Sequence, residues 1–239
     1  MFRVKLLALV VVGVMSPGAM VRAQGKPTEQ VEEIRRSTWI ETIPVALPAG
    51  VPLAGVVGTD ADGYPTQFVD RPALRSLLRN RQFAELTAAF EYFQAEFERD
   101  PHREVWMSDA TTTVGMPHPV ELGLIEEWIK TTPRSFAPYL ARARYGFELG
   151  FLYRGDRLAK DTSAAEFAAM KRSFANAERD ARKALELRPR LIEVRSFMMK
   201  AAIARGDRAD ATRWVAEGLR QLLAREPVEG RRPDFAQAG

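Results

Sequence analysis

The sequence predicts an all-α fold, in which a short α-solenoid of antiparallel helical hairpins follows an irregular, Pro/Gly-rich N-terminal segment. From residue 70 onward, apolar residues recur at spacings of three and four, the period of an amphipathic helix. Before residue 70, prolines and glycines interrupt the apolar runs. We therefore divide the chain into a signal peptide (1–23), an irregular segment (24–69), a helical domain (70–226) and a flexible tail (227–239).

The composition is that of a globular protein and excludes several kinds of site. The chain has 239 residues, of which 46% are hydrophobic and 28% are charged. Because the sequence contains no cysteine, it offers no thiol nucleophile, no cysteine ligand for zinc or an iron-sulfur cluster, and no cysteine for lipidation.

The net charge of +4 does not predict a nucleic-acid partner. Three basic residues lie in the first 23, which contain no acid, and the rest of the chain has 32 basic and 31 acidic residues. There the arginines alternate with acids, as in Glu178-Arg179-Asp180. Since binding to phosphates requires clusters of uncompensated positive charge, we expect solvated helix faces of mixed charge instead.

The first 23 residues are typical of a secretory signal peptide. Arg3 and Lys5 precede an apolar run at 6–14, and Ala23 is suited to the last position before cleavage. The apolar run is shorter than the roughly 20 residues that a membrane span needs. We therefore expect cleavage after Ala23, a periplasmic or secreted protein, and no stable membrane insertion once the signal is removed.

The segment before residue 70 is too rich in helix breakers to be helical. Residues 44–65 contain four prolines and four glycines, which predict a loop or a pair of short extended pieces around 51–57. The stretch Asp60-Ala61-Asp62-Gly63 is similar to the start of a calcium loop. However, Tyr64 and Arg71 stand where two of the ligands would be, so a surface turn is the better interpretation.

Two helices are predicted between residues 70 and 101. Asp70 is suited to cap the first, which begins near Pro72. In the second, four apolar residues at spacings of four, three and four form one aromatic-rich stripe before Pro101, which indicates a core face. The buried faces of the two helices are Leu74, Leu77 and Leu78, and Leu86, Phe90, Phe93 and Phe97.

Residues 102–118 are expected to be less regular, and they contain both histidines of the chain. One cluster there suggests acid-base chemistry or metal binding: His102, Glu104, Asp109 and His118. The two histidines lack the close helical spacing of a zinc motif, and the sequence has neither a nucleophile elbow nor a phosphate loop. We therefore assign no catalytic, cofactor-binding or metal-ligating residue and expect no cofactor.

Five more helices are predicted from residue 119 to 226. The first begins at Pro119, and the second, which begins near Pro138 and ends at Gly155, is apolar on two sides and is expected in the interior. The third begins with a capping box at Ser163 and Glu166. The last two span 191–206 and 207–226. The inward residues expected in the final helix are Ala211, Val215, Gly218 and Leu222.

The ends of these helices repeat along the chain. The run from Pro133-Arg134 to Arg154-Gly155-Asp156 is similar to the run from Pro189-Arg190 to Arg205-Gly206-Asp207. Over about 170–225 the small residues and the helix-ending proline resemble a tetratricopeptide repeat, although its bulky first-helix tryptophan is missing. Small side chains about seven residues apart let antiparallel helices approach closely. The positions concerned are Ala177, Ala184, Pro189, Gly206, Ala211 and Gly218.

A second resemblance covers more of the chain. The sequence is similar to the bacterial family called domain of unknown function 4034, which implies a tetratricopeptide-like helical domain without an established activity. The segments that carry it are Asp62-Gly63-Tyr64-Pro65 through Leu77-Leu78, Phe83-Ala84-Glu85-Leu86, Phe97-Glu98, Trp128, Pro133-Arg134-Ser135, Ala141-Arg142 and Arg154-Gly155.

Two functions remain open. We expect an exported helical-repeat protein that serves as a peptide- or protein-binding adapter, because stacked hairpins present a continuous groove. The alternative is a helical enzyme with a site around His102, Glu104, Asp109 and His118. A pocket in which carboxylates and a histidine converge would favour the enzyme.

Overall fold

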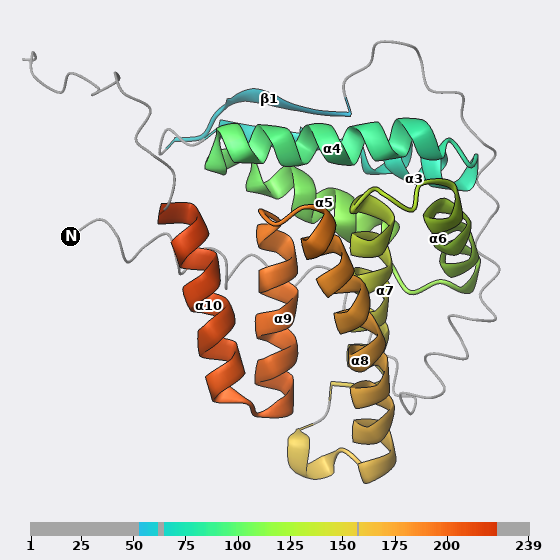
Figure 1. The fold of residues 1–239 in the computed structure, drawn as a ribbon, viewed down its shortest axis with the longest axis vertical. Helices are drawn as coiled ribbons and strands as arrows, with labels where there is room; N and C mark the ends of the chain where they lie inside the picture. Colours follow the sequence, from blue (N-terminus) through green and yellow to red (C-terminus); the bar gives the residue numbers. More distant parts are fainter. Residues whose placement is uncertain (1–52, 62–64, 157, 224–239) are drawn as a thin grey trace, which may run out of the picture.

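The computed structural model describes residues 53–61, 65–156 and 158–223. This part of the chain forms one β-hairpin and eight α-helices, so the predicted all-α fold with helical hairpins is confirmed (Figure 1). The predicted signal peptide (1–23), residues 24–52 and the predicted tail (227–239) lie outside the described residues.

The β-hairpin precedes the helices. Strand β1 (Ala54–Thr59) pairs with strand β2 (Pro65–Val69) in antiparallel register, with an irregularity between Val56 and Gly58. The sequence left two alternatives for this stretch, a loop or a pair of short extended pieces. The hairpin agrees with the second alternative. Proline is tolerated at the first position of a strand and glycine at a bulge, so the Pro/Gly-rich composition excludes a helix here but not a hairpin.

Four helices follow the hairpin: α3 (Arg71–Arg79), α4 (Phe83–Arg99), α5 (Glu104–Val114) and α6 (Pro119–Thr131). A 3-10 turn, η1 (Pro101–Arg103), joins α4 to α5. As predicted, Asp70 caps α3, where its Oδ1 accepts the backbone N–H of Ala73 at 2.9 Å. The predicted stripe on α4 is fully buried.

The expectation that residues 102–118 are irregular is wrong, because helix α5 occupies most of them. Threonine is a poor helix former, but two hydroxyls of the threonine run donate to carbonyls of the preceding turn. Thr111 Oγ1 donates to Met107 O, and Thr113 Oγ1 donates to Asp109 O, both at 2.7 Å. A buried face that includes Trp106 supplies the packing that outweighs the low propensity.

Four further helices form the second part of the chain: α7 (Ala137–Arg154), α8 (Ala164–Leu187), α9 (Ile192–Arg205) and α10 (Arg208–Leu223). A 3-10 turn, η2 (Ala159–Asp161), precedes α8. Helices α7 and α8 pack as one hairpin and α9 and α10 as the next, side by side in Figure 1, with α4 across one end. No helix in the described ranges is both long and apolar enough to cross a membrane.

The predicted helix ends are confirmed in this part. Ser163 and Glu166 form a complete capping box at the start of α8. Gly155 and Gly206 follow α7 and α9 with φ of +70° and +76°, which explains why glycine recurs at both hairpin ends. Asp207 caps α10, where its Oδ1 accepts the backbone N–H of Asp210 at 3.0 Å.

Small residues allow α7 and α8 to pack closely. A Cβ added to Gly146 would lie 2.8 Å from the Cβ of Ala177, which itself is only 1% exposed. Ser173 Oγ donates to the carbonyl of Gly146 at 2.8 Å, and Arg142 pairs with both oxygens of Asp180 at 2.8 Å. The small-residue pattern thus marks a real helix–helix contact.

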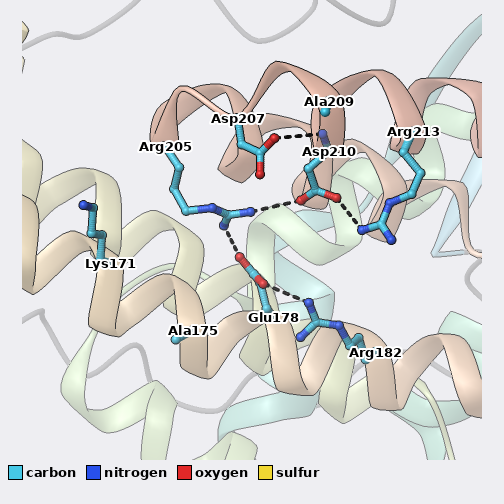
Figure 2. Close-up of a pocket in the computed structure, with 9 residues that line it drawn as sticks. All are labelled: Lys171, Ala175, Glu178, Arg182, Arg205, Asp207, Ala209, Asp210 and Arg213. Atoms are coloured by element: carbon cyan, nitrogen blue, oxygen red, sulfur yellow. Dashed lines mark hydrogen bonds and ion pairs between the residues drawn. The ribbon is translucent and has the colours of Figure 1, made fainter.

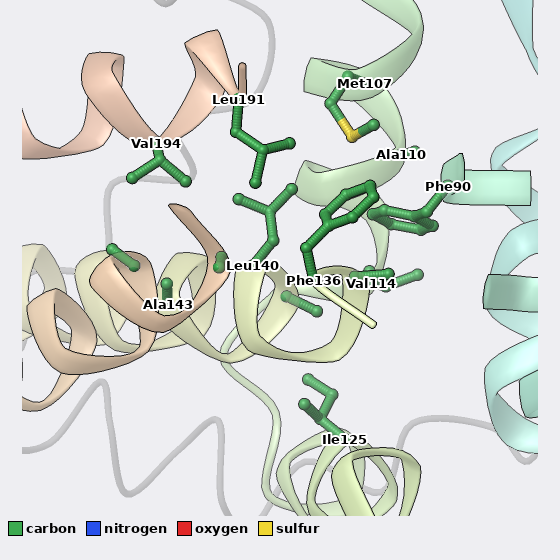
Figure 3. Close-up of a cluster of buried hydrophobic side chains, with 14 of the residues drawn as sticks. Phe90, Met107, Ala110, Val114, Ile125, Phe136, Leu140, Ala143, Leu191 and Val194 are labelled. Carbon is green, nitrogen blue, oxygen red and sulfur yellow. The ribbon is translucent and has the colours of Figure 1, made fainter. Parts of the chain in front are cut away.

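One core joins the two parts. Phe136 and Leu140, at the start of α7, lie between α4, α5, α6 and the start of α9 (Figure 3). Helix α7 therefore lies in the interior, as predicted. The inward face of α10 differs from the prediction in one respect: Trp214, 7% exposed, is its large buried residue, whereas Ala211, Val215 and Leu222 are half-buried.

Candidate functional site

The two histidines hold local structure at opposite ends of α5. His102 Nδ1 lies 2.8 Å from Asp100 Oδ1. Burial disfavours the ionised carboxyl of Asp100, but hydrogen bonds from His102 and the charge of Arg103 hold its pKa below the usual value. His118 precedes α6, and its Nδ1 accepts the backbone N–H of Val120 at 3.3 Å. The structure thus gives each histidine a separate role near a helix end.

The two predicted acids of α5, Glu104 and Asp109, both interact electrostatically with Glu193 of α9. Burial raises the pKa of Glu104, and the neighbouring charge of Glu193 raises it further. The pKa of Glu193 is raised mainly by burial, and Asp109 adds to that effect. Asp109 also pairs with Arg71, with 2.8 Å between Nη2 and Oδ1.

Positive groups of α7 and α9 lie beside these acids. Arg144 Nη2 is 2.7 Å from Glu148 Oε1, its Nη1 is 3.9 Å from Glu193 Oε1, and its guanidinium lies over the ring of Phe197. Burial lowers the pKa of Lys200, and the charge of Glu193 acts against that shift. We call this group the α5–α7–α9 cluster: Glu104, Ser108, Asp109, Arg144, Glu148, Glu193 and Lys200.

Sequence reasoning found only two members of this cluster, Glu104 and Asp109 of α5. One sequence signal was available on α7 and α9: Arg144 and Glu148 are four residues apart, and Glu193 and Lys200 are seven apart, so each pair shares a helix face. That spacing reveals a polar stripe on each helix. It does not reveal that the stripes meet α5, because the meeting depends on tertiary packing between segments far apart in sequence.

A pocket of about 660 Å³ lies on other elements, between α8 and α10 and beside the end of α9 (Figure 2). Helix α8 contributes residues spaced by four, three and four, so they lie on one face. The pocket is open to solvent. The lining residues are Lys171, Ala175, Glu178, Arg182, Arg205, Asp207, Ala209, Asp210 and Arg213.

A chain of ion pairs crosses the pocket and ties its three helices together. Arg205, the last residue of α9, bridges Glu178 of α8 and Asp210 of α10 (Figure 2). At one end of the chain Arg182 Nη2 lies 3.0 Å from Glu178 Oε2, and at the other end Arg213 pairs with Asp210. We call these nine lining residues the α8–α10 pocket. The side chains of the ion-pair chain are held in place before any ligand arrives.

The two regions suit different chemistry. The α5–α7–α9 cluster holds carboxyls whose pKa values are raised, a setting suited to proton exchange. The α8–α10 pocket offers fixed donors and acceptors in a hollow surface, a setting suited to binding. In the part of the chain that the structure describes, no three His, Asp or Glu side chains gather in a way that could hold a metal ion.

Comparisons with known proteins identify a family and are silent about activity. A search of curated proteins found no match, and a search of solved structures found none. The sequence matches the family described as Domain of unknown function (DUF4034) over residues 70–235, a range that begins at the cap of α3 and contains all eight described helices. That match covers well over half of the sequence, and the chain therefore belongs to this family.

Proposed function

We propose that the protein is a binding module that holds a protein or peptide partner in the α8–α10 pocket. The observation that carries this proposal is the chain of ion pairs from Arg182 to Arg213, which fixes polar side chains of three helices around one hollow. Groups held in their binding geometry lose little conformational freedom when a partner arrives, so a pre-formed site binds more tightly than a mobile one.

The stacking of the hairpins supports this proposal. Helices α8 and α10 are the second helices of two successive hairpins, and a stack of hairpins presents such helices as one continuous surface. The tetratricopeptide-like character of the hairpins, suggested by the register of Ala177 and Ala184, belongs to the same proposal. We also propose that the protein has no catalytic activity of its own, since the two histidines and Asp109 are engaged in caps and ion pairs.

Site-specific photo-crosslinking in the cells that make the protein tests the binding role. A benzophenone amino acid at Ala175, an exposed residue of the pocket, should form a polypeptide adduct. The same probe at Ala95, an exposed residue of α4, is the matched control and should form none. Filling the pocket with Ala209→Trp should remove the Ala175 adduct. Equal adducts at both positions, or none at Ala175, would contradict the proposal.

We further propose that the protein is exported, to the periplasm or the medium. The positively charged start, the apolar run at 6–14 and Ala23 support this. N-terminal sequencing of the protein from the cell envelope and from the medium should give Gln24 as the first residue. A sequence that starts at Met1 or Phe2 in the mature protein would contradict export through this signal.

One observation favours a second candidate function, acid-base chemistry at the α5–α7–α9 cluster. Glu104 and Glu193 both have raised pKa values and the nearby Lys200 a lowered one, and such perturbed groups gather at catalytic sites. Structural ion-pair networks perturb pKa values as well, so a further test is needed. In a catalytic cluster, Glu193→Gln should abolish turnover in a screen of substrates while the fold is unchanged; equal turnover would exclude this role.

A further inference from the structure

In the α8–α10 pocket two of the three acids are largely covered, whereas three of the four bases are exposed to solvent. The side chains of Glu178 and Asp210 are 13% and 17% exposed, and each accepts from two guanidinium groups. Arg182 and Arg213, at the two ends of the ion-pair chain, are 54% and 59% exposed. The numbers of basic and acidic residues in the lining nearly balance, but the surface offered to a ligand is positive.

Lys171 adds a further positive charge to this surface. It lies on the same face of α8 as Glu178 and Arg182, and Figure 2 shows it apart from the ion-pair chain. Within the described ranges it makes no hydrogen bond or ion pair. Arg182 and Arg213 each use one terminal nitrogen toward a carboxylate of the pocket and keep further N–H donors, since a guanidinium has five.

We propose that the α8–α10 pocket binds an acidic segment of a polypeptide, whose Asp and Glu side chains pair with Lys171, Arg182 and Arg213. This inference rests on the proposed binding function and names the chemistry of the partner. Lys171 and Arg182 are eleven residues apart on α8, about 16 Å along the helix axis. An extended segment rises about 3.3 Å per residue, so acids four to six residues apart in the segment reach both bases. Each carboxylate accepts charge-assisted hydrogen bonds from the exposed guanidinium groups.

The pocket fits a polypeptide better than a nucleic acid. Asp207 is exposed in the lining, and it repels phosphate groups but accepts the backbone N–H groups of a peptide. The methyl groups of Ala175 and Ala209 contribute apolar surface. Nucleic-acid binding also draws on many uncompensated charges spread along the backbone, whereas the pocket offers three exposed bases, Lys171, Arg182 and Arg213.

Fluorescence anisotropy with labelled synthetic probes tests the inference on the purified protein. The probes are a peptide of alternating Glu and Ala, the same peptide with Gln or Lys in place of Glu, and an oligothymidylate. The Glu peptide should bind, the other three should not, and added salt should weaken the binding. The affinity of the Glu peptide for the double variant Lys171→Gln/Arg182→Gln should be about tenfold lower than for the unaltered protein.

The matched control is Arg99→Gln/Lys130→Gln, which removes the same charge from exposed positions on α4 and α6. This variant should bind the Glu peptide as the unaltered protein does. An equal loss in both variants would show a diffuse charge effect and overturn the inference, and so would pocket-dependent binding of the oligothymidylate. If the Glu peptide does not bind while the Ala175 adduct still forms, the partner is not acidic, but the proposed binding function stands.

Discussion

The two parts of the core differ in how closely their helices approach one another. Between α4, α5 and α6 the contacts are made by large rings: Trp128 stacks on Phe83 at 6.4 Å and meets the edge of Phe90 at 5.6 Å. Between α7 and α8 rings also meet, Phe147 with Phe174 at 5.5 Å and Phe151 with Phe174 at 5.1 Å. However, the two backbones approach closely only because Gly146, which has no side chain, faces Ala177. The first part is therefore sensitive to the deletion of atoms and the second to their addition.

The largest effect is expected from Trp128→Ala. Trp128 is fully buried, and its Nε1 donates to Thr87 Oγ1 at 2.8 Å. The variant loses ring packing and leaves a cavity, which typically costs about 3–5 kcal/mol in the free energy of unfolding. Chemical denaturation measures the loss. Trp128→Phe, which retains a ring, should lose less and serves if the alanine variant does not fold.

Tyr92→Ala is the control for that prediction. Tyr92 also stacks on a tryptophan, Trp106, but its ring lies at the surface and is 51% exposed. Its loss should cost about 1 kcal/mol, in line with an aromatic pair without a cavity. If Tyr92→Ala and Trp128→Ala were equally costly, the stability of this part would not depend on buried ring contacts.

Ala177→Leu tests the second part of the core from the opposite direction. The added atoms must displace the backbone of α7 at Gly146, and such overpacking costs about 1–3 kcal/mol. Ala175→Leu, two residues away on the exposed side of the same helix, should be nearly neutral, because leucine is almost as good a helix former as alanine. Thermal denaturation compares the two. Equal melting temperatures of the two variants would mean that the packing of α7 against α8 does not require small residues at their contact.

The sequence predicted features that are encoded locally. The cap at Asp70, the capping box at Ser163 and the stripe ending at Phe97 each depend on residues within a few positions of one another. The small-residue register around Ala177 was equally visible. In each case the spacing along the chain determines the geometry, and tertiary context only supplies the partner.

What the sequence did not reveal depends on tertiary structure. Helix α5 forms despite its threonines because packing around Trp106 and hydroxyl bonds to the backbone compensate for low propensity. The side chains around Glu193 come from three helices, and no local spacing brings them together. The same is true of the α8–α10 pocket, where Arg205 joins charges from the helices on both sides.

Two glycine substitutions, one in each part, are expected to change the free energy of unfolding by smaller amounts and in opposite directions. Gly206 has φ of +76°, so Gly206→Ala forces a side chain into the left-handed region and should cost about 1–2 kcal/mol. Gly123, inside α6, has nothing within 4 Å of an added Cβ, so Gly123→Ala should stabilise by about 0.5–1 kcal/mol. Denaturant titration of the two variants measures whether each substitution lowers or raises the free energy of unfolding. A stabilising Gly206→Ala would show that the end of α9 does not need a left-handed residue.

The smallest effect is expected where the two parts meet, at Glu193. Its folded-state pKa is raised by burial, although Arg144, Lys200 and a hydrogen bond with Ser108 act against the shift. Between the unfolded pKa, about 4.3, and the raised folded value, the folded protein binds more protons than the unfolded chain. The stability contributed by the protonated carboxyl is therefore present at low pH and is lost as the pH rises through that window.

Glu193→Gln should remove this part of the pH dependence, because the amide stays neutral and its oxygen can still accept from Ser108. Melting temperatures measured from pH 4 to pH 8 should fall less steeply for the variant than for the unaltered protein. Glu104, whose pKa is raised in the same direction, retains its own contribution, so the slope should decrease without vanishing. Glu85→Gln on the exposed side of α4 should leave the profile unchanged. If Glu193→Gln and Glu85→Gln gave the same dependence of melting temperature on pH, burial of the Glu193 carboxyl would not contribute to the pH dependence of stability.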